Sequence, residues 1–143
     1  MTKTETQNLD YTKEVMKRFL KPKHMGEIKD ADAIGKVGNA KCGDIMWVYL
    51  KIDKDKKTGK EKIKDIKFKT MGCVAAIASS DAVCEVAKGK TLEQALKITK
   101  KDIVKKLGSL PPIKYHCSIL GEEALLSAIN DYKSKYSGIN NNL

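Results

Sequence analysis

The sequence has almost no arginine and few aromatic residues, and this scarcity limits the kinds of partner that its positive charge could bind. The net charge is +10, from 28 basic and 18 acidic residues, yet Arg18 is the only arginine and aromatic residues make up 6% of the chain. Proteins that read nucleic acids rely on arginine forks and clustered aromatic side chains. The lysines are instead spread from Lys3 to Lys135, as on a solvated surface. We therefore expect no nucleic-acid partner, and attraction to acidic proteins fits this charge better.

Long apolar runs and C-x-x-C pairs are also missing. The first ten residues are polar and do not form the apolar core of a signal peptide, and no apolar run approaches the roughly 20 residues of a membrane span. We expect a cytoplasmic protein with no membrane partner. In that compartment cysteines favour metal binding or thiol chemistry over disulfides, and the absence of C-x-x-C argues against a zinc finger or ribbon.

Hydrophobic periodicity predicts an α+β fold, with a small antiparallel sheet of about three strands packed by four to five helices. Apolar, β-branched and aromatic residues predict strands at residues 34–38, 45–52 and 62–71, and the last two form a hairpin. Apolar residues at helical spacing predict helices at residues 11–20 and 74–88, short helices after Thr91 and Thr99, and a final helix from Ile119. We expect a disordered N-terminus at 1–10, one domain over 11–136 and a flexible tail at 137–143.

A pair of prolines shortly precedes a histidine and a cysteine that are adjacent in the sequence. Pro111 and Pro112 have fixed φ angles and bias the residue before them toward an extended conformation. We therefore expect a stiff, exposed strap that no helix runs through. Its role would be to hold His116 and Cys117 in a defined place.

Two other parts of the chain present metal-binding side chains. Cys42 and Asp44 have i, i+2 spacing, so they share one face if the strand extends back to them, and Gly43 between them permits close approach of the backbone. Cys73 follows the returning strand of the hairpin and can lie beside the start of the first strand. It also precedes a predicted helix, whose positive end lowers the pKa of a thiol.

These positions suggest one site of three thiols, a carboxylate and an imidazole: Cys42, Asp44, Cys73, His116 and Cys117. Such donors suit zinc or iron–sulfur chemistry. Each residue alone also has an ordinary structural explanation, as a buried apolar thiol, a turn or capping aspartate, or a core or surface histidine. Spacing alone leaves both interpretations open.

The fourth cysteine, Cys84, lies 11 residues after Cys73, or roughly 16 Å along a helix. We expect it to pack in the core.

Three motifs taken together resemble those of IscU/NifU-type iron–sulfur cluster scaffold proteins. They are Cys42-Gly43-Asp44, the segment at 72–80 that begins Gly72-Cys73, and the segment at 110–118 that contains His116-Cys117. The resemblance extends from about Tyr11 to Lys135, with the motifs in order. It leaves open the IscU or NifU subtype, and whether the protein is a monomer or a cluster-bridged dimer.

The resemblance implies a carrier, and not a turnover enzyme, that builds a labile [2Fe–2S] cluster and transfers it to apo iron–sulfur proteins. Cys42, Cys73 and Cys117 would ligate the cluster, with Asp44 or His116 completing the coordination. An oxygen or nitrogen donor among thiolates would make the holder labile, and we assign that role to Asp44. Zinc commonly binds the same ligands in such proteins.

The resemblance also implies partners. A cysteine desulfurase would deliver persulfide sulfur, and Cys117 matches the favoured acceptor. A recognition segment for an Hsp70-type chaperone is matched by Leu110, Pro111, Pro112, Ile113 and Lys114. The alternative is a zinc-dependent sulfur acceptor of the SufU type, which shares the Cys-Gly-Asp and Gly-Cys motifs. Such proteins tend to lack the His-Cys pair that this chain carries after its prolines.

Overall fold

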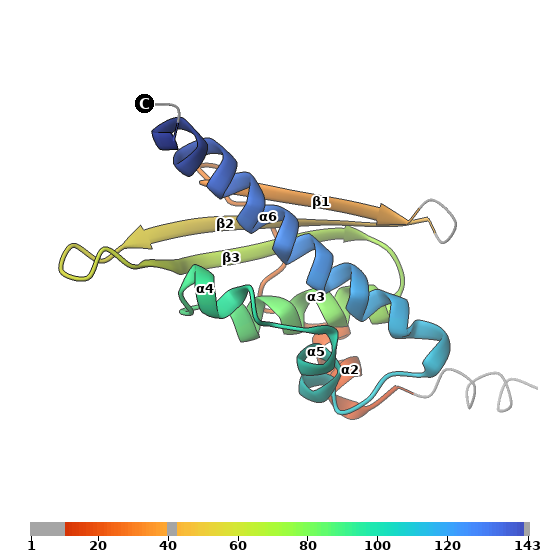
Figure 1. Ribbon diagram of the computed structural model, residues 1–143. Helices are drawn as coiled ribbons and strands as arrows, with labels where there is room; N and C mark the ends of the chain where they lie inside the picture. The colour runs from red at the N-terminus through yellow and green to blue at the C-terminus, as the bar shows by residue number, and fades with distance from the viewer. Residues whose placement is uncertain (1–10, 40–42, 142–143) are drawn as a thin grey trace, which may run out of the picture.

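The structure, a computed structural model, describes residues 11–39 and 43–141 (Figure 1). Three antiparallel strands form its sheet, in the order β1-β2-β3, and the pairing of β2 with β3 confirms the predicted hairpin. Their bounds are Ala33–Asn39 for β1, Asp44–Lys54 for β2 and Glu61–Met71 for β3. In β2 every second residue from Asp44 to Leu50 is buried, as expected of a strand with one face on the core.

Short helices and one long helix complete an α+β fold in a single domain, as predicted. Their bounds are Lys13–Leu20 for α2, Val74–Ala87 for α3, Leu92–Ala95 for α4, Lys100–Leu107 for α5 and Tyr115–Asn141 for α6. Helices α4 and α5 each begin with a capping box, in which a side chain three residues into the helix accepts a hydrogen bond from the backbone N–H of the capping threonine. The predicted helix starts at Thr91 and Thr99 are therefore confirmed.

Helix α6 crosses the sheet in Figure 1 and packs on β1 and β2, while α3 packs beside it against β3. Gly35 of β1 makes the closest approach possible, because a Cβ atom there would overlap the backbone of Ala124 and Ala128 in α6. Helices α2 and α5 pack against α3. This arrangement brings the start of β2, the start of α3 and the start of α6 to one end of the molecule. Among the described residues, no helix is long and apolar enough to span a membrane.

The region around the two prolines differs from the predicted strap. Residues Pro112–Lys114 form a 3₁₀ turn and α6 begins directly after it at Tyr115, four residues before the predicted start. Proline suits the first turn of a helix because its missing N–H would have no partner there and its φ is already helical. The prolines therefore start a helical segment, and His116 and Cys117 lie in its first full turn. The expected exposure is also wrong at Leu110 and Pro111, which are buried.

At its C-terminal end, helix α6 extends to Asn141, so it overlaps the segment expected to be a flexible tail. The flexibility of 137–143 stays a prediction, as does that of residues 1–10.

Candidate metal-binding site

Side chains from three separate segments converge at one end of the sheet. Asp44 begins β2, Cys73 immediately precedes α3, and His116 and Cys117 lie in the first turn of α6. One donor atom each from Asp44, His116 and Cys117 lie within 4.8 Å of one another. Cys73 joins them through a distance of 3.8 Å between its Sγ and that of Cys117. Four of the five predicted site residues are thus brought together, and the fifth, Cys42, lies outside the described residues.

The spacing of these donor atoms suits a shared metal ion. Cys117 Sγ lies 3.8 Å from Asp44 Oδ2 and 3.5 Å from His116 Nε2, and the last two atoms are 3.6 Å apart. Ligands bound tetrahedrally at 2.0–2.3 Å from one metal would be separated by roughly 3.3–3.8 Å. The three donors therefore already stand at ligand-to-ligand distances, and their mixture of sulfur, nitrogen and oxygen suits zinc or iron.

The imidazole of His116 is oriented by the turn that precedes it. Its Nδ1 lies 3.1 Å from the carbonyl oxygen of Ile113, which can only accept a hydrogen bond. Nδ1 is therefore the donor, and in the neutral ring Nε2 is the atom with the free lone pair. That atom faces Asp44 and Cys117. A backbone partner of this kind fixes the tautomer and aim of many metal-binding histidines.

Glycine at position 72 leaves the space that the Asp44 carboxylate occupies. A Cβ atom at Gly72 would lie 3.0 Å from Asp44 Oδ1 and 2.8 Å from the Cβ of Ala76. Asp44 is only 8% exposed, so its side chain has little room to move aside. Gly72 belongs to one of the three motifs, but sequence reasoning assigned it no role. A glycine directly before a predicted ligand was the available signal.

The two described site thiols differ in protonation. Cys73 is half-buried, and the hydrogen bond from the Cys117 thiol, supported by the Ala76 N–H in the first turn of α3 and by the Lys114 ammonium, lowers the pKa of Cys73 to about 5. Cys117 is fully buried, and its pairing with Cys73 together with burial raises the pKa of Cys117. At neutral pH the pair therefore holds one thiolate, at Cys73, and one thiol. The predicted low pKa of Cys73 is confirmed, although Cys117 contributes more to it than the helix end.

Lys114 is a part of this site that the sequence did not reveal. Burial favours a lower pKa for its ammonium, but the Cys73 thiolate and its neighbours outweigh burial and raise the pKa of Lys114. Lys114 therefore lies close enough to the thiols to stabilise negative charge on them. A cation beside thiolates favours the anionic ligands that a metal or cluster requires.

Comparison with known proteins identifies the family. Residues 10–138 match the family model described as the NifU-like N terminal domain. The chain belongs to this family. It is 50% identical over 125 residues to a protein of Archaeoglobus fulgidus named iron-sulfur cluster assembly scaffold protein IscU 1, covering 87% of this chain and 78% of the relative. It is 42% identical over 128 residues to the IscU scaffold protein of Aquifex aeolicus, covering 90% and 79%.

A solved structure of a putative iron-sulfur cluster assembly scaffold protein for the SUF system, from Fervidobacterium islandicum AW-1, superposes with a TM-score of 0.68. The identity is 24%, and the match covers 87% of this chain and 98% of that one. At this identity the likeness supports the fold alone. The three-stranded sheet with its covering helices is therefore common to both proteins.

Two further predictions concern Cys84 and the segment matched to chaperone recognition. Cys84 is fully buried in α3 within the hydrophobic core, and burial raises its pKa, which confirms that it packs in the core. In the predicted chaperone segment only part of the surface is accessible. Pro112 and Ile113 are exposed and Lys114 is half-buried, whereas Leu110 and Pro111 face the core.

Proposed function

We propose that this chain is a scaffold on which a labile [2Fe–2S] cluster is assembled and from which it is passed to apo iron–sulfur proteins. The observation that carries the proposal is the convergence of Asp44, Cys73, His116 and Cys117 in a member of this family. The cluster is cargo, and the chain acts as a carrier. We also propose that it works in the cytoplasm.

The proposed ligands are Cys42, Cys73 and Cys117, with Asp44 or His116 as the fourth. Cys42 enters this set through its place in the Cys-Gly-Asp motif. Asp44 and His116, the two candidates for the fourth ligand, differ in exposure. The side chain of Asp44 is 11% exposed, whereas that of His116 is 30% exposed and is oriented by its hydrogen bond to the Ile113 carbonyl. An oxygen donor binds soft iron–sulfur clusters less firmly than thiolate does, which fits a carrier that must release what it holds.

Sulfur would reach the site as a persulfide on a cysteine desulfurase, and we propose Cys117 as its acceptor. The Cys117 thiolate would attack the outer persulfide sulfur, forming a new S–S bond and releasing the desulfurase cysteine as a thiolate. The step transfers sulfur without an external oxidant or reductant. Because Cys117 is buried and protonated beside Cys73, it must pass its proton on and be uncovered. Docking of the desulfurase at the start of α6 would have to supply that exposure.

Release would be promoted by an Hsp70-type chaperone that binds the exposed residues Pro112 and Ile113 and the half-buried Lys114. This turn is mechanically joined to the site, because the Ile113 carbonyl orients His116 and the Lys114 ammonium lies near Cys73. Gripping the turn would therefore disturb two groups at the site together. Replacement of Pro111 and Pro112 by alanine should abolish chaperone-stimulated transfer, and unchanged stimulation would remove the handle from the proposal.

Anaerobic incubation with ferrous iron, cysteine and a desulfurase tests the function as a whole. A visible iron–sulfur chromophore that is lost in Cys73→Ser and Cys117→Ser, but retained in Cys84→Ser, is the expected result. Cys84→Ser is the matched control because that thiol lies in the core away from the site. Failure to form a chromophore would refute the scaffold. Retention of zinc with sulfur uptake would instead establish the SufU-type alternative, and zinc without sulfur uptake a structural zinc protein.

A further inference from the structure

A hollow of about 850 Å³, which we call the basic basin, lies beside Arg18 and the carboxylates that pair with it. We define the basic basin as the hollow between α2, the second half of α3, α4 and α5. Eight cationic and four anionic side chains line it, a net charge of +4. Nothing in the proposed cluster chemistry uses these groups. Glu85, on its floor, follows Cys73 by 12 residues on the same helix, or about 18 Å along its axis.

The floor of the basin is a closed ion-pair network. Arg18 is 5% exposed and its guanidinium lies 2.9 Å from Asp81 Oδ2, 2.9 Å from Glu85 Oε2 and 2.8 Å from Glu14 Oε2. Lys106 Nζ lies 2.8 Å from the same Glu85 oxygen. The pairs of Arg18 with Asp81 and Glu85 hold α2 against α3, while the buried Arg18 Nε, although 2.8 Å from Glu14, makes no hydrogen bond. The guanidinium is buried among three carboxylates, so it is not available to an anionic ligand.

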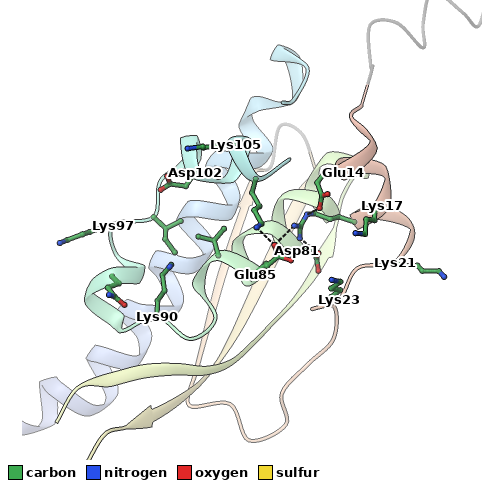
Figure 2. A pocket seen from close by; sticks show the side chains of 15 residues that line it. Glu14, Lys17, Lys21, Lys23, Asp81, Glu85, Lys90, Lys97, Asp102 and Lys105 are labelled. Carbon is green, nitrogen blue, oxygen red and sulfur yellow. Dashed lines mark hydrogen bonds and ion pairs between the residues drawn. The ribbon is translucent and has the colours of Figure 1, made fainter. Parts of the chain in front are cut away.

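The rim, by contrast, carries lysines with no such partners. The six are Lys17, Lys21, Lys23, Lys90, Lys97 and Lys105. Figure 2 shows the first three on one side of the basin and the other three on the opposite side. Within residues 11–39 and 43–141, none of the six forms an ion pair, although four other lysines outside the basin do. The rim therefore carries positive charge on both sides of the hollow that no ion pair neutralises.

The chemistry of the lining favours carboxylates over phosphates. Phosphate sites usually use arginine forks or free backbone N–H groups at a helix start. Here the one arginine is already paired with carboxylates. At the starts of the two helices beside the basin, Gln94 and Asp102 of the lining accept hydrogen bonds from the backbone N–H groups of Thr91 and Thr99, and Glu122 accepts from the N–H of Lys100. Separate lysine ammonium groups instead pair singly with separate carboxylates. The lining also includes two apolar side chains, half-buried Val86 and buried Ile98.

We propose that the basic basin docks an acidic segment of a partner protein, with several Asp or Glu side chains and an aliphatic residue among them. The carboxylates pair with lysines on the two sides, and the aliphatic residue packs against Val86. Because the basin lies along α3 from Cys73, a partner held there has its body near the cluster site. Opposite charge raises the rate of encounter and fixes orientation more than it raises affinity. The basin would therefore select acidic proteins and present them to the site in one orientation.

The test uses the metal-free chain and a fluorescein-labelled peptide of four Glu-Asp-Leu repeats. One variant reverses a rim lysine on each side, Lys21→Glu with Lys97→Glu. The matched control reverses two exposed lysines outside the basin, Lys64→Glu with Lys133→Glu, and changes the net charge equally. Fluorescence anisotropy at several salt concentrations gives the affinity, and ¹⁵N chemical shifts give the position of the peptide.

The basin variant should weaken peptide binding by about tenfold at physiological salt and the control by less than about twofold, because the Debye length there is about 8 Å and only close charge pairs escape screening. The peptide should shift backbone signals of α2, α4 and α5. Equal weakening in both variants, or shifts elsewhere, would overturn the proposal. Tripolyphosphate that binds the basin more tightly than the peptide would overturn it too. Since no iron or desulfurase is present, failure here is distinct from failure of cluster assembly.

Discussion

Replacing Gly72 by alanine should damage the metal-binding site through the neighbouring Asp44. The new Cβ would lie 3.0 Å from Asp44 Oδ1 and 3.2 Å from its Cγ, where ordinary contacts begin at 3.4 Å. The carboxylate must therefore retreat by about 0.4 Å. Gly72 does not have a positive φ, so alanine introduces no backbone strain of its own. The substitution thus tests the position of the carboxylate.

The size of the effect follows from the tolerance of such sites. A retreat of about 0.4 Å uses most of the roughly 0.5 Å within which a metal ligand must be held, so the effect lies at the low end of the loss of about 10- to 100-fold seen when a group that orients a ligand is removed. We expect zinc affinity to fall by about tenfold. The contact with the Ala76 Cβ adds an overpacking cost to folding of about 1–3 kcal/mol.

Competition with a chromophoric chelator measures zinc affinity, and urea unfolding of the metal-free protein measures the packing cost separately. Gly38→Ala is the matched control, because its Cβ would approach Ile45 and the Asp44 backbone only to 3.5 and 3.6 Å. Zinc affinity of that variant should equal that of wild type.

A double-mutant cycle tests whether Gly72→Ala weakens zinc binding through the Asp44 carboxylate. If Gly72→Ala acts through the carboxylate, adding it to Asp44→Ala should weaken zinc binding little further. Wild-type affinity in a folded Gly72→Ala protein would refute the reasoning. So would full additivity with Asp44→Ala, since the alanine would then act on something else.

Three further predictions concern stability and thiol reactivity. Gly35→Ala should lower the free energy of unfolding by at least about 1–3 kcal/mol in urea, because its Cβ would overlap the α6 backbone; a smaller loss would mean that α6 can shift. Iodoacetamide at pH 6.5 should alkylate Cys73 before Cys84, because the pKa of Cys73 is about 5 whereas burial raises the pKa of Cys84. Peptide mass spectrometry measures the order of alkylation, and the reverse order would contradict the prediction. Lys106, then Arg18, lower the pKa of Glu85 to about 2, so its contribution to stability is present above about pH 4.5 and is lost as the pH falls toward 2. Wild type should lose stability over that range more steeply than Glu85→Gln, and parallel losses would contradict the pairing.

Much of the fold could be predicted from sequence because its signals are local. The hairpin of β2 and β3 follows from two apolar runs around a charged loop, and the starts of α4 and α5 follow from capping residues near Thr91 and Thr99. The separation of Cys73 and Cys84 along one helix was enough to predict that Cys84 lies away from the site. These features depend on neighbours within a few residues.

The parts that sequence reasoning missed depend on contacts between distant segments. The prolines read equally well as a stiff strap or as a helix start, and only the docking of the segment on the core, with Leu110 buried, selects the second. Gly72 acquires its role from Asp44, which lies on another strand. The thiol pair at Cys73 and Cys117 likewise needs two helix starts to meet, so its shared proton could not be predicted from either motif.

The measurement that tests the central claim most directly is transfer of the cluster to an apo-ferredoxin. The chain would be loaded anaerobically, separated from free iron, and mixed with the apo-ferredoxin in the presence of a chelator that captures released iron. We predict stoichiometric appearance of the ferredoxin spectrum, with transfer from Asp44→Ala slower than from wild type. A chromophore that stays on the chain while the ferredoxin remains apo would contradict the account, and equal rates for the two proteins would remove Asp44 from its role in release.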